Sequence, residues 1–284
     1  MEGTMEAQAQ QHTDKRLVIC NWKAYLGIAE SVRAAEAIAE SFSDSEKGCL
    51  LAIAPANLAL CRVGEIISKA GISLCAQDID IGGKGAKTGS TPIEVLEEAG
   101  CEFAIIGHSE RRHRKAPETK ESDALINRKL DICLNSQIIP ILCTGETEEE
   151  RYRGATNNAI KKQLVGGLEG ISAEAKESIE KLVVAYEPVW AISSNRISRI
   201  PDVTEVNEAC KMIRRHLYSL FVKEKADRIR IIYGGSVEPA NVSAYLSVNG
   251  IRGVLVGKVG TDAAKMEAML KAVGSGPMAQ LLPS

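Results

Sequence analysis

The sequence has no long hydrophobic run and no strong excess of one charge. No apolar stretch approaches the ~18 consecutive residues of a membrane-spanning helix, so we expect no membrane contact. The formal net charge is −2 over 284 residues, too small to gather nucleic acid or anionic lipid. The one dense basic run, residues 111–115, is typical of a solvated loop or helix end. We therefore expect neither nucleic-acid nor membrane partners.

The sequence also lacks the spacings of a metal centre. Its eight cysteines include no Cys-x-x-Cys pair, which argues against a zinc site. Cys20, Cys75 and Cys143 lie inside apolar runs, where a thiol behaves as a small hydrophobic group. Residues 1–14 are polar and lack the apolar core of a secretory signal. We expect reduced cysteines in a cytoplasmic protein that needs neither a metal nor a cofactor.

No linker or change of composition divides the chain. Hydrophobic residues make up 45% and charged residues 25%, which are ordinary values for a globular domain. The prediction is a single domain over residues 15–275, preceded by a disordered tail over 1–14 and followed by a C-terminal tail over 276–284.

Eight short apolar runs alternate with longer amphipathic segments. The runs are rich in Val and Ile without polar alternation, as strands buried on both faces are. They are residues 17–20, 50–54, 72–76, 103–106, 138–143, 182–186, 229–233 and 254–256. Helical patterns occupy 29–42, 58–70, 93–99, 123–134, 148–164, 203–221, 240–246 and 263–272. This alternation predicts a closed (β/α)₈ barrel, and a doubly wound open sheet is the alternative on periodicity alone.

Polar residues and glycines follow the apolar runs where a barrel would place an active site. In a (β/α)₈ barrel that site forms at the C-terminal ends of the strands. The candidates are Asn21, Lys23, His108, Glu110, Glu187, Gly234, Gly235, Ser236, Gly257 and Lys258. A lysine, a histidine and a carboxylate thus meet on one rim, beside glycine-rich turns whose helix N-termini suit phosphate.

This set of groups suits proton transfer next to a carbonyl. Such a reaction needs a base, a group that stabilises charge on oxygen, and exclusion of water. A hinged loop directly after Glu187 supplies the last of these. Glu110 either takes part in proton transfer or pairs structurally with Lys23. Cys143 is expected to pack rather than act as a nucleophile.

Four motifs resemble those of the triosephosphate isomerase family, in order and each at the matching strand end. They are residues 21–23 (NWK), 106–112 (IGHSERR), 185–192 (AYEPVWAI) and 233–237 (YGGSV). The resemblance runs from about residue 15 to about residue 273. It implies an aldose–ketose isomerase of glycolysis and gluconeogenesis that interconverts dihydroxyacetone phosphate and D-glyceraldehyde 3-phosphate through an enediolate.

The resemblance also implies a role for each candidate residue. Glu187 would move the proton, and His108 would polarise the carbonyl as a neutral imidazole, a pairing for which this family is the standard example. Lys23 would offset charge on the enediolate and phosphate, and Asn21 would position Lys23. The phosphate would bind the N–H groups of Ser193, Ser236, Gly257 and Lys258, and the closed lid would rest on Tyr233 and Ser236.

Residues 81–90 form a glycine-flanked polar excursion whose central part is residues 82–89. Their spacing does not match the phosphate-binding loop of nucleotide enzymes. They are similar to the protruding third loop of the family, which inserts Thr88 into a partner subunit. The resemblance therefore implies a homodimer.

The match departs from the family in the lid and in one phosphate turn. The lid reads Ser193-Ser194-Asn195-Arg196, and Lys258 stands where a second glycine is usual. We expect Lys258 to keep a negative φ, with its N–H toward phosphate and its ammonium toward solvent. Two alternatives stay open: an isomerase of a four-carbon ketose phosphate, and a non-catalytic phosphate-binding barrel, against which the intact Lys23, His108 and Glu187 speak.

Overall fold

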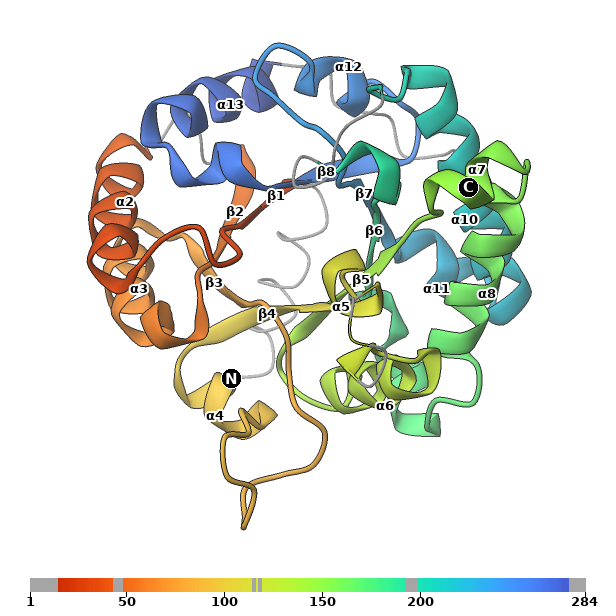
Figure 1. Ribbon diagram of the computed structural model, residues 1–284, viewed down its shortest axis with the longest axis horizontal. Coiled ribbons are helices and arrows are strands. Elements are labelled where there is room, and N and C mark those ends of the chain that lie inside the picture. Colours follow the sequence, from red (N-terminus) through yellow and green to blue (C-terminus); the bar gives the residue numbers. More distant parts are fainter. Residues whose placement is uncertain (1–14, 43–47, 114–115, 117–118, 193–198, 276–284) are drawn as a thin grey trace.

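Eight parallel strands close into a barrel in sequence order (Figure 1). The computed structural model describes residues 15–42, 48–113, 116, 119–192 and 199–275. Each strand pairs with the next along the chain, and β8 closes the barrel against β1. The (β/α)₈ prediction is confirmed, and the open-sheet alternative is excluded. Residues 1–14 and 276–284 lie outside the described residues, so the proposed tails and domain bounds stay predictions.

Each predicted apolar run overlaps one strand. The strands are β1 Arg16–Asn21, β2 Cys49–Ala54, β3 Ser73–Ala76, β4 Cys101–Ile106, β5 Ile139–Thr144, β6 Val183–Tyr186, β7 Arg230–Tyr233 and β8 Ile251–Val256. Successive side chains of a strand point to opposite faces. In β1, Leu17 and Ile19 fill the barrel interior, while Val18 and Cys20 pack against the outer helices. Both faces are buried, which explains why the runs lack polar alternation.

The outer layer of helices follows the predicted pattern with additions. Each predicted segment contains a helix, in order α2 Ile28–Ser41, α3 Leu60–Ile67, α4 Ile93–Glu98, α6 Asp123–Leu134, α8 Thr156–Leu168, α10 Val203–Leu220, α12 Val242–Leu246 and α13 Ala263–Ser275. Short helices that the periodicity does not resolve are α5 Ser109–Arg112, α7 Glu148–Tyr152, α9 Ala173–Glu177 and α11 Lys223–Arg228. Single 3₁₀ turns are η2 Asn57–Ala59, η3 Ser68–Ala70, η5 Ile179–Lys181, η6 Val189–Ala191 and η7 Lys258–Thr261.

The prediction of one helix over residues 148–164 is wrong. α7 ends at Tyr152 and α8 begins at Thr156. Between them Gly154 takes a φ of 67°, a left-handed conformation that stops a helix and that glycine adopts at little cost. The amphipathic pattern continues across this break, so periodicity alone does not reveal it.

All eight cysteines are free, and seven of them are buried. Burial raises the pKa of the Cys20 and Cys75 thiols well above the ordinary value. These thiols stay protonated and pack as apolar groups, as expected from their sequence context. Within the described ranges, no helix is both long and apolar enough to cross a membrane.

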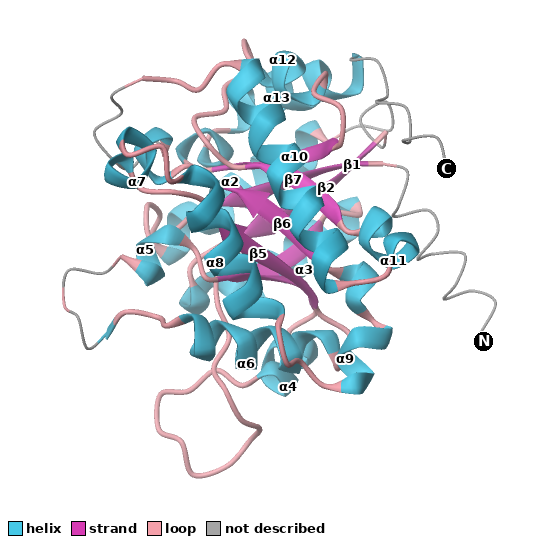
Figure 2. Cartoon of the chain, turned by 90° about the vertical axis from the view of Figure 1, so that its right-hand side faces the viewer, coloured by secondary structure: helices cyan, strands magenta, loops and turns pink. Residues whose placement is uncertain are grey.

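The segment between β3 and α4 projects from the body of the barrel as a long loop (Figures 1 and 2). Its base is closed by a backbone bond from Asp80 N–H to the Thr91 carbonyl (3.2 Å) and by Thr91 N–H to the Asp80 carboxylate (2.6 Å). Thr88 lies in the projecting part and is exposed. The excursion predicted over residues 81–90 is therefore present.

Candidate active site

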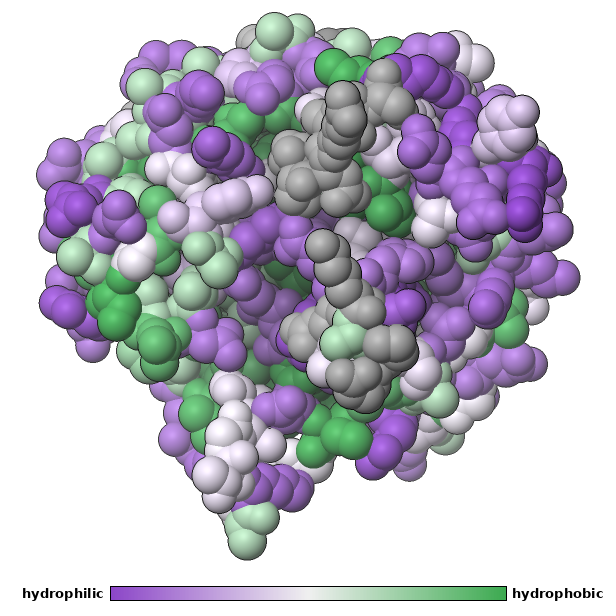
Figure 3. Space-filling view, viewed as in Figure 1, coloured by the Kyte–Doolittle hydropathy of each residue, from purple (hydrophilic) through white to green (hydrophobic). Residues whose placement is uncertain are grey.

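The C-terminal ends of β1, β4 and β6 bring together Lys23, His108 and Glu187. Figure 3 shows this end of the barrel hollowed at its centre, with hydrophilic residues gathered around the hollow. A cavity of about 310 Å³ at this end is lined by Asn21, Lys23, His108 and Glu110, among others. Residues from strand ends that are far apart in the sequence thus share one opening.

Lys23 is held in an unusual backbone conformation. Its φ is 49°, the only positive φ of a non-glycine residue within the described ranges. Lys23 N–H donates to the side-chain oxygen of Asn21 (3.0 Å), and the Lys23 carbonyl accepts from Gln77 Nε2 (2.8 Å). Such strain persists only where the surroundings enforce it, and it is common at functional sites. The Lys23 ammonium ends 2.9 Å from a carboxylate oxygen of Glu110.

The ring of His108 is fixed in one tautomer. Its Nδ1 accepts the backbone N–H of Glu110 at 3.2 Å, at the start of α5. Because Nδ1 accepts a hydrogen bond, it carries no proton, and the ring proton sits on Nε2. His108 is therefore a neutral imidazole that presents an N–H donor.

That donor faces Glu187. His108 Nε2 lies 3.4 Å from Glu187 Oε1, and the two residues are 4% and 2% exposed. His108 Nε2 and Glu187 Oε2 are buried with no hydrogen-bond partner among the described residues. A buried polar atom without a partner costs free energy. Two such atoms side by side are arranged to receive a ligand.

Glycines make room for Glu187. A Cβ at Gly145 would lie 2.1 Å from the Glu187 carbonyl oxygen, and one at Gly234 would lie 2.6 Å from the Glu187 Cγ. A Cβ at Gly235 would lie 2.1 Å from the Tyr233 hydroxyl. A side chain at Gly145 would clash with the Glu187 backbone, one at Gly234 with the Glu187 side chain, and one at Gly235 with the Tyr233 phenol.

The Cys143 thiol lies beside this carboxylate. Burial, with the charge of Glu187 next to it, raises the pKa of Cys143 well above its ordinary value. A thiol that stays protonated is a poor nucleophile, which agrees with the expected packing role.

The two predicted phosphate turns line one cavity of about 270 Å³. Gly235, Ser236, Gly257 and Lys258 form part of its wall. Lys258 begins η7 without a positive φ, and its side chain is exposed. The backbone of Lys258 therefore avoids the left-handed region, as expected, and the directions of its N–H and its ammonium stay predictions. Ser193 and the altered lid residues 194–196 lie outside the described residues.

Tyr233 lies behind these turns. Its ring packs against that of Tyr245 with centroids 4.3 Å apart, and its hydroxyl is buried with no hydrogen-bond partner in the described parts of the chain. The phenol is thus held by its packing against Tyr245 at this end of the barrel.

Known proteins are similar in sequence to this chain along the whole barrel. A family model described as triosephosphate isomerase matches residues 16–273. The chain belongs to the triosephosphate isomerase family. It is 38% identical over 257 residues to a triosephosphate isomerase of Chlorobaculum tepidum, covering 90% of this chain and all (100%) of that protein. It is 37% identical over 246 residues to a triosephosphate isomerase of Dictyoglomus thermophilum, covering 86% of this chain and 93% of that protein. It is 36% identical over 258 residues to a triosephosphate isomerase of Prosthecochloris aestuarii, covering 91% of this chain and 98% of that protein. The resemblance inferred from the four motifs is confirmed.

Within this family member, the basic run after His108 differs from its sequence-based interpretation. Arg111 and Arg112 were expected in a solvated loop or helix end; they do end the short helix α5, but both are paired with acidic side chains. Arg112 is ion-paired with Asp123 at 2.6 Å, with only 8% of its side chain exposed. Arg111 binds Glu121 at 2.7 Å. Residues 114 and 115 lie outside the described residues. Glu121 lies just before α6 and Asp123 is the first residue of that helix, so these partners lie outside the run of charges itself, which does not reveal them.

One site residue was missed. Gln77 directly follows β3, and its Nε2 donates to both the Lys23 and Ala54 carbonyls (2.8 and 2.9 Å). It therefore fixes the strained turn that carries Lys23. The same rule that found the other candidates, a polar residue directly after an apolar run, also points to Gln77.

Proposed function

We propose that this chain interconverts dihydroxyacetone phosphate and D-glyceraldehyde 3-phosphate with Glu187 as base. The observation that carries the proposal is the buried pair formed by the Glu187 carboxylate and the neutral His108 imidazole, 3.4 Å apart, each with an unpaired polar atom. Membership of the triosephosphate isomerase family supports the same reaction. Among the residues that the structure describes, we find no feature that favours a four-carbon substrate.

The reaction follows from what these groups can do. Glu187 takes a proton from the hydroxyl-bearing carbon beside the carbonyl, and the C–H electron pair becomes the C=C bond of an enediolate. The negative charge that develops on the former carbonyl oxygen faces the Nε2–H of His108 and the ammonium of Lys23. That oxygen then gains a proton and the other oxygen loses one. Glu187 returns its proton to the former carbonyl carbon, which completes the exchange of aldehyde and ketone.

The substrate phosphate would bind at the two turns that line the 270 Å³ cavity. The backbone N–H groups of Ser236, Gly257 and Lys258 would hold the phosphate, together with Ser193 of the lid. Asn21 positions the Lys23 turn, and Gly234 and Gly235 keep space for Glu187 and Tyr233. Glu110 holds the Lys23 ammonium in place.

A homodimer built through the Thr88 loop is the second part of this proposal. The loop is exposed and projects from the barrel, and Tyr25 and Leu58 next to the 310 Å³ cavity are 41% and 85% exposed. Exposed apolar groups beside an opening suit a protein partner. A cytoplasmic location likewise stays a prediction.

The test is turnover in D₂O. Isomerisation of dihydroxyacetone phosphate, coupled to an aldehyde-consuming enzyme, should place solvent deuterium on the carbon next to the carbonyl. Product without solvent deuterium would argue for an intramolecular hydride shift, and no product at all would refute the isomerase proposal.

A further inference from the structure

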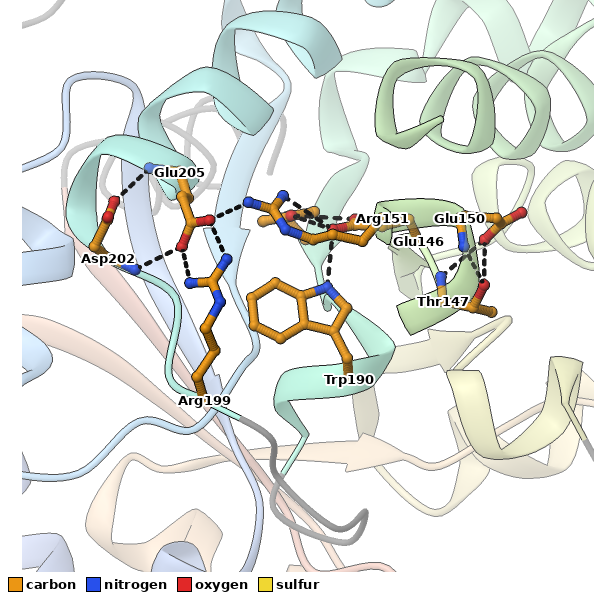
Figure 4. Close-up of polar contacts among 9 residues, drawn as sticks. Glu146, Thr147, Glu150, Arg151, Trp190, Arg199, Asp202 and Glu205 are labelled. Carbon is orange, nitrogen blue, oxygen red and sulfur yellow. Dashed lines mark hydrogen bonds and ion pairs between the residues drawn. The ribbon is translucent and has the colours of Figure 1, made fainter. Parts of the chain in front are cut away.

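Trp190 lies beside two arginines (Figure 4) and follows the proposed base by three residues. It belongs to η6, which begins two residues after Glu187. The Cζ atom of Arg151 is 5.1 Å from the centroid of the indole, and that of Arg199 is 4.8 Å away. Both distances fit a cation–π contact.

One carboxylate joins the two arginines. Arg199 donates to Glu205 through both ends of its guanidinium, and one of these bonds measures 2.5 Å. Arg151 donates to the same carboxylate. Two-pronged contacts of this kind combine charge with a defined geometry. The hydrogen bonds from Arg199 lower the pKa of Glu205 to about 2, so the carboxylate stays charged near neutral pH.

Glu205 is itself firmly anchored. It occupies the first turn of α10, an 18-residue helix, and forms a capping box with Asp202. Glu205 N–H donates to the Asp202 carboxylate (2.8 Å), and Asp202 N–H donates to the Glu205 carboxylate (3.0 Å). The clamp formed by Arg199, Arg151 and Glu205 therefore ties Trp190 to the end of a long helix.

The indole N–H of Trp190 binds Glu146, which also contacts the residues before and after the base. The Trp190 Nε1–H donates to Glu146 at 2.9 Å, and Glu146 is 0% exposed. The Tyr186 hydroxyl donates to the same carboxylate at 3.2 Å, and Val189 N–H donates to the Glu146 carbonyl at 2.9 Å. Tyr186 directly precedes Glu187 and Val189 follows it by two residues. A shift of Trp190 therefore disturbs the contacts that flank Glu187.

We propose that Arg199 is a positioning residue for the base. Together with Glu205 it presses Trp190 against Glu146 and so fixes the segment from Tyr186 to Trp190, including Glu187. Arg151 reaches Glu146 directly (3.5 Å), so it would still hold Glu146 if Arg199 were removed. The contacts that Arg199 makes within the described part of the chain are with the indole and Glu205. The kinetic part of this inference rests on the proposed function, and the structural part does not.

The test compares three changes in the clamp with one outside it. Arg199→Met removes the charge and the two-pronged contact with Glu205 while keeping a flexible side chain. Arg199→Lys keeps the charge without the two-pronged contact. Glu205→Gln removes the charge and retains a side chain that can complete a capping box. Arg153→Met is the control, because Arg153 pairs with Glu149 on the same connection and both side chains are 71% exposed.

We expect Arg199→Met to lower kcat roughly three- to tenfold with KM within twofold of the original, because a misplaced base affects the chemical step more than binding. Arg199→Lys should restore part of kcat, Glu205→Gln should resemble Arg199→Met, and Arg153→Met should change nothing. In a Trp22→Phe background, which leaves Trp190 as the only tryptophan, its emission maximum should shift in Arg199→Met and in Glu205→Gln. It should not shift in Arg153→Met.

Two results would overturn the proposal. One is an Arg199→Met protein with unchanged kcat and unchanged Trp190 emission. The other is a loss in which kcat falls in parallel with the melting temperature and Arg199→Lys gives no rescue, since that pattern indicates general destabilisation. If the original protein has no isomerase activity, the proposed function fails, and the emission of Trp190 still decides whether the clamp holds it.

Discussion

His108 Nε2 and Glu187 Oε1 lie 3.4 Å apart at the ends of two different strands, each in a buried setting. The backbone N–H of Glu110 holds His108 as a neutral donor, and the glycines at 145 and 234 let Glu187 approach it. We therefore expect the reacting carbon and oxygen of the substrate to lie between the His108–Glu187 pair and the opening lined by Lys23. The following predictions test this arrangement.

Glu187→Gln should keep the fold and lose most of the activity. Removing a general base typically costs ~10²–10⁴-fold in rate, because the amide does not accept the proton. Circular dichroism should be unchanged while kcat falls by that range in the coupled assay. A variant within threefold of the original would exclude Glu187 as the base.

Gly234→Ala should lower kcat strongly. The new Cβ would lie 2.6 Å from the Glu187 Cγ, so the carboxylate must move, and a displacement of about 1 Å can cost ~10²-fold. Gly274→Ala is the matched control, since a Cβ there meets nothing within 4 Å. Equal activities of the two variants would contradict the steric role of Gly234.

Lys258→Gly should change KM only slightly. Lys258 lies at the start of η7 with an exposed side chain, and its contribution to phosphate binding is assigned to its backbone N–H. If the ammonium instead bound phosphate, its loss would cost ~1.5–3 kcal/mol, seen as a rise in KM of tenfold or more. Steady-state kinetics on the triose substrate distinguish the two outcomes.

Glu205 should stabilise the fold in a pH-dependent manner. Its pKa falls from an ordinary 4.5 to about 2 in the folded state, so the folded carboxylate binds protons less readily than the unfolded one. Its contribution is fully present above pH 4.5 and is lost as the pH falls toward 2. Urea unfolding at several pH values should therefore show Glu205→Gln destabilised at pH 7, with the difference shrinking in acid. A difference that grows in acid would contradict this account.

The protein should be a dimer at micromolar concentration. Thr88→Glu should give monomers, because a charge at the tip of the projecting loop would be buried without a partner in the second subunit. Tyr152→Glu is a suitable control, since Tyr152 is 93% exposed on α7, away from this loop. Light scattering that shows only monomers of the original chain would refute the dimer.

The strand pattern made the barrel predictable, and the barrel made the rim predictable. Apolar runs such as residues 103–106 fix the strands, and in a barrel the active site forms among the polar residues that follow the strand ends. The sequence therefore predicted that His108 and Glu187 lie in the same site, but it did not predict the distance between them. Gln77 obeys the same rule and was overlooked.

The contacts that sequence analysis did not reveal join residues far apart in the chain. Arg111 and Arg112 were interpreted as solvated because their acidic partners lie ten residues or more away. The clamp on Trp190 has the same origin, since Arg151 and Glu205 are 54 positions apart. Local patterns carry no information on such pairs. The clamp, for example, depends on how α7, η6 and α10 pack together.

The most direct test of the account is the ratio of kcat/KM for D-glyceraldehyde 3-phosphate to that for a four-carbon sugar phosphate, measured with the same preparation. Glu187, His108 and the phosphate turns predict a ratio well above ten in favour of the triose. A ratio below one, or no turnover of the triose, would contradict the central claim that this barrel is a triosephosphate isomerase.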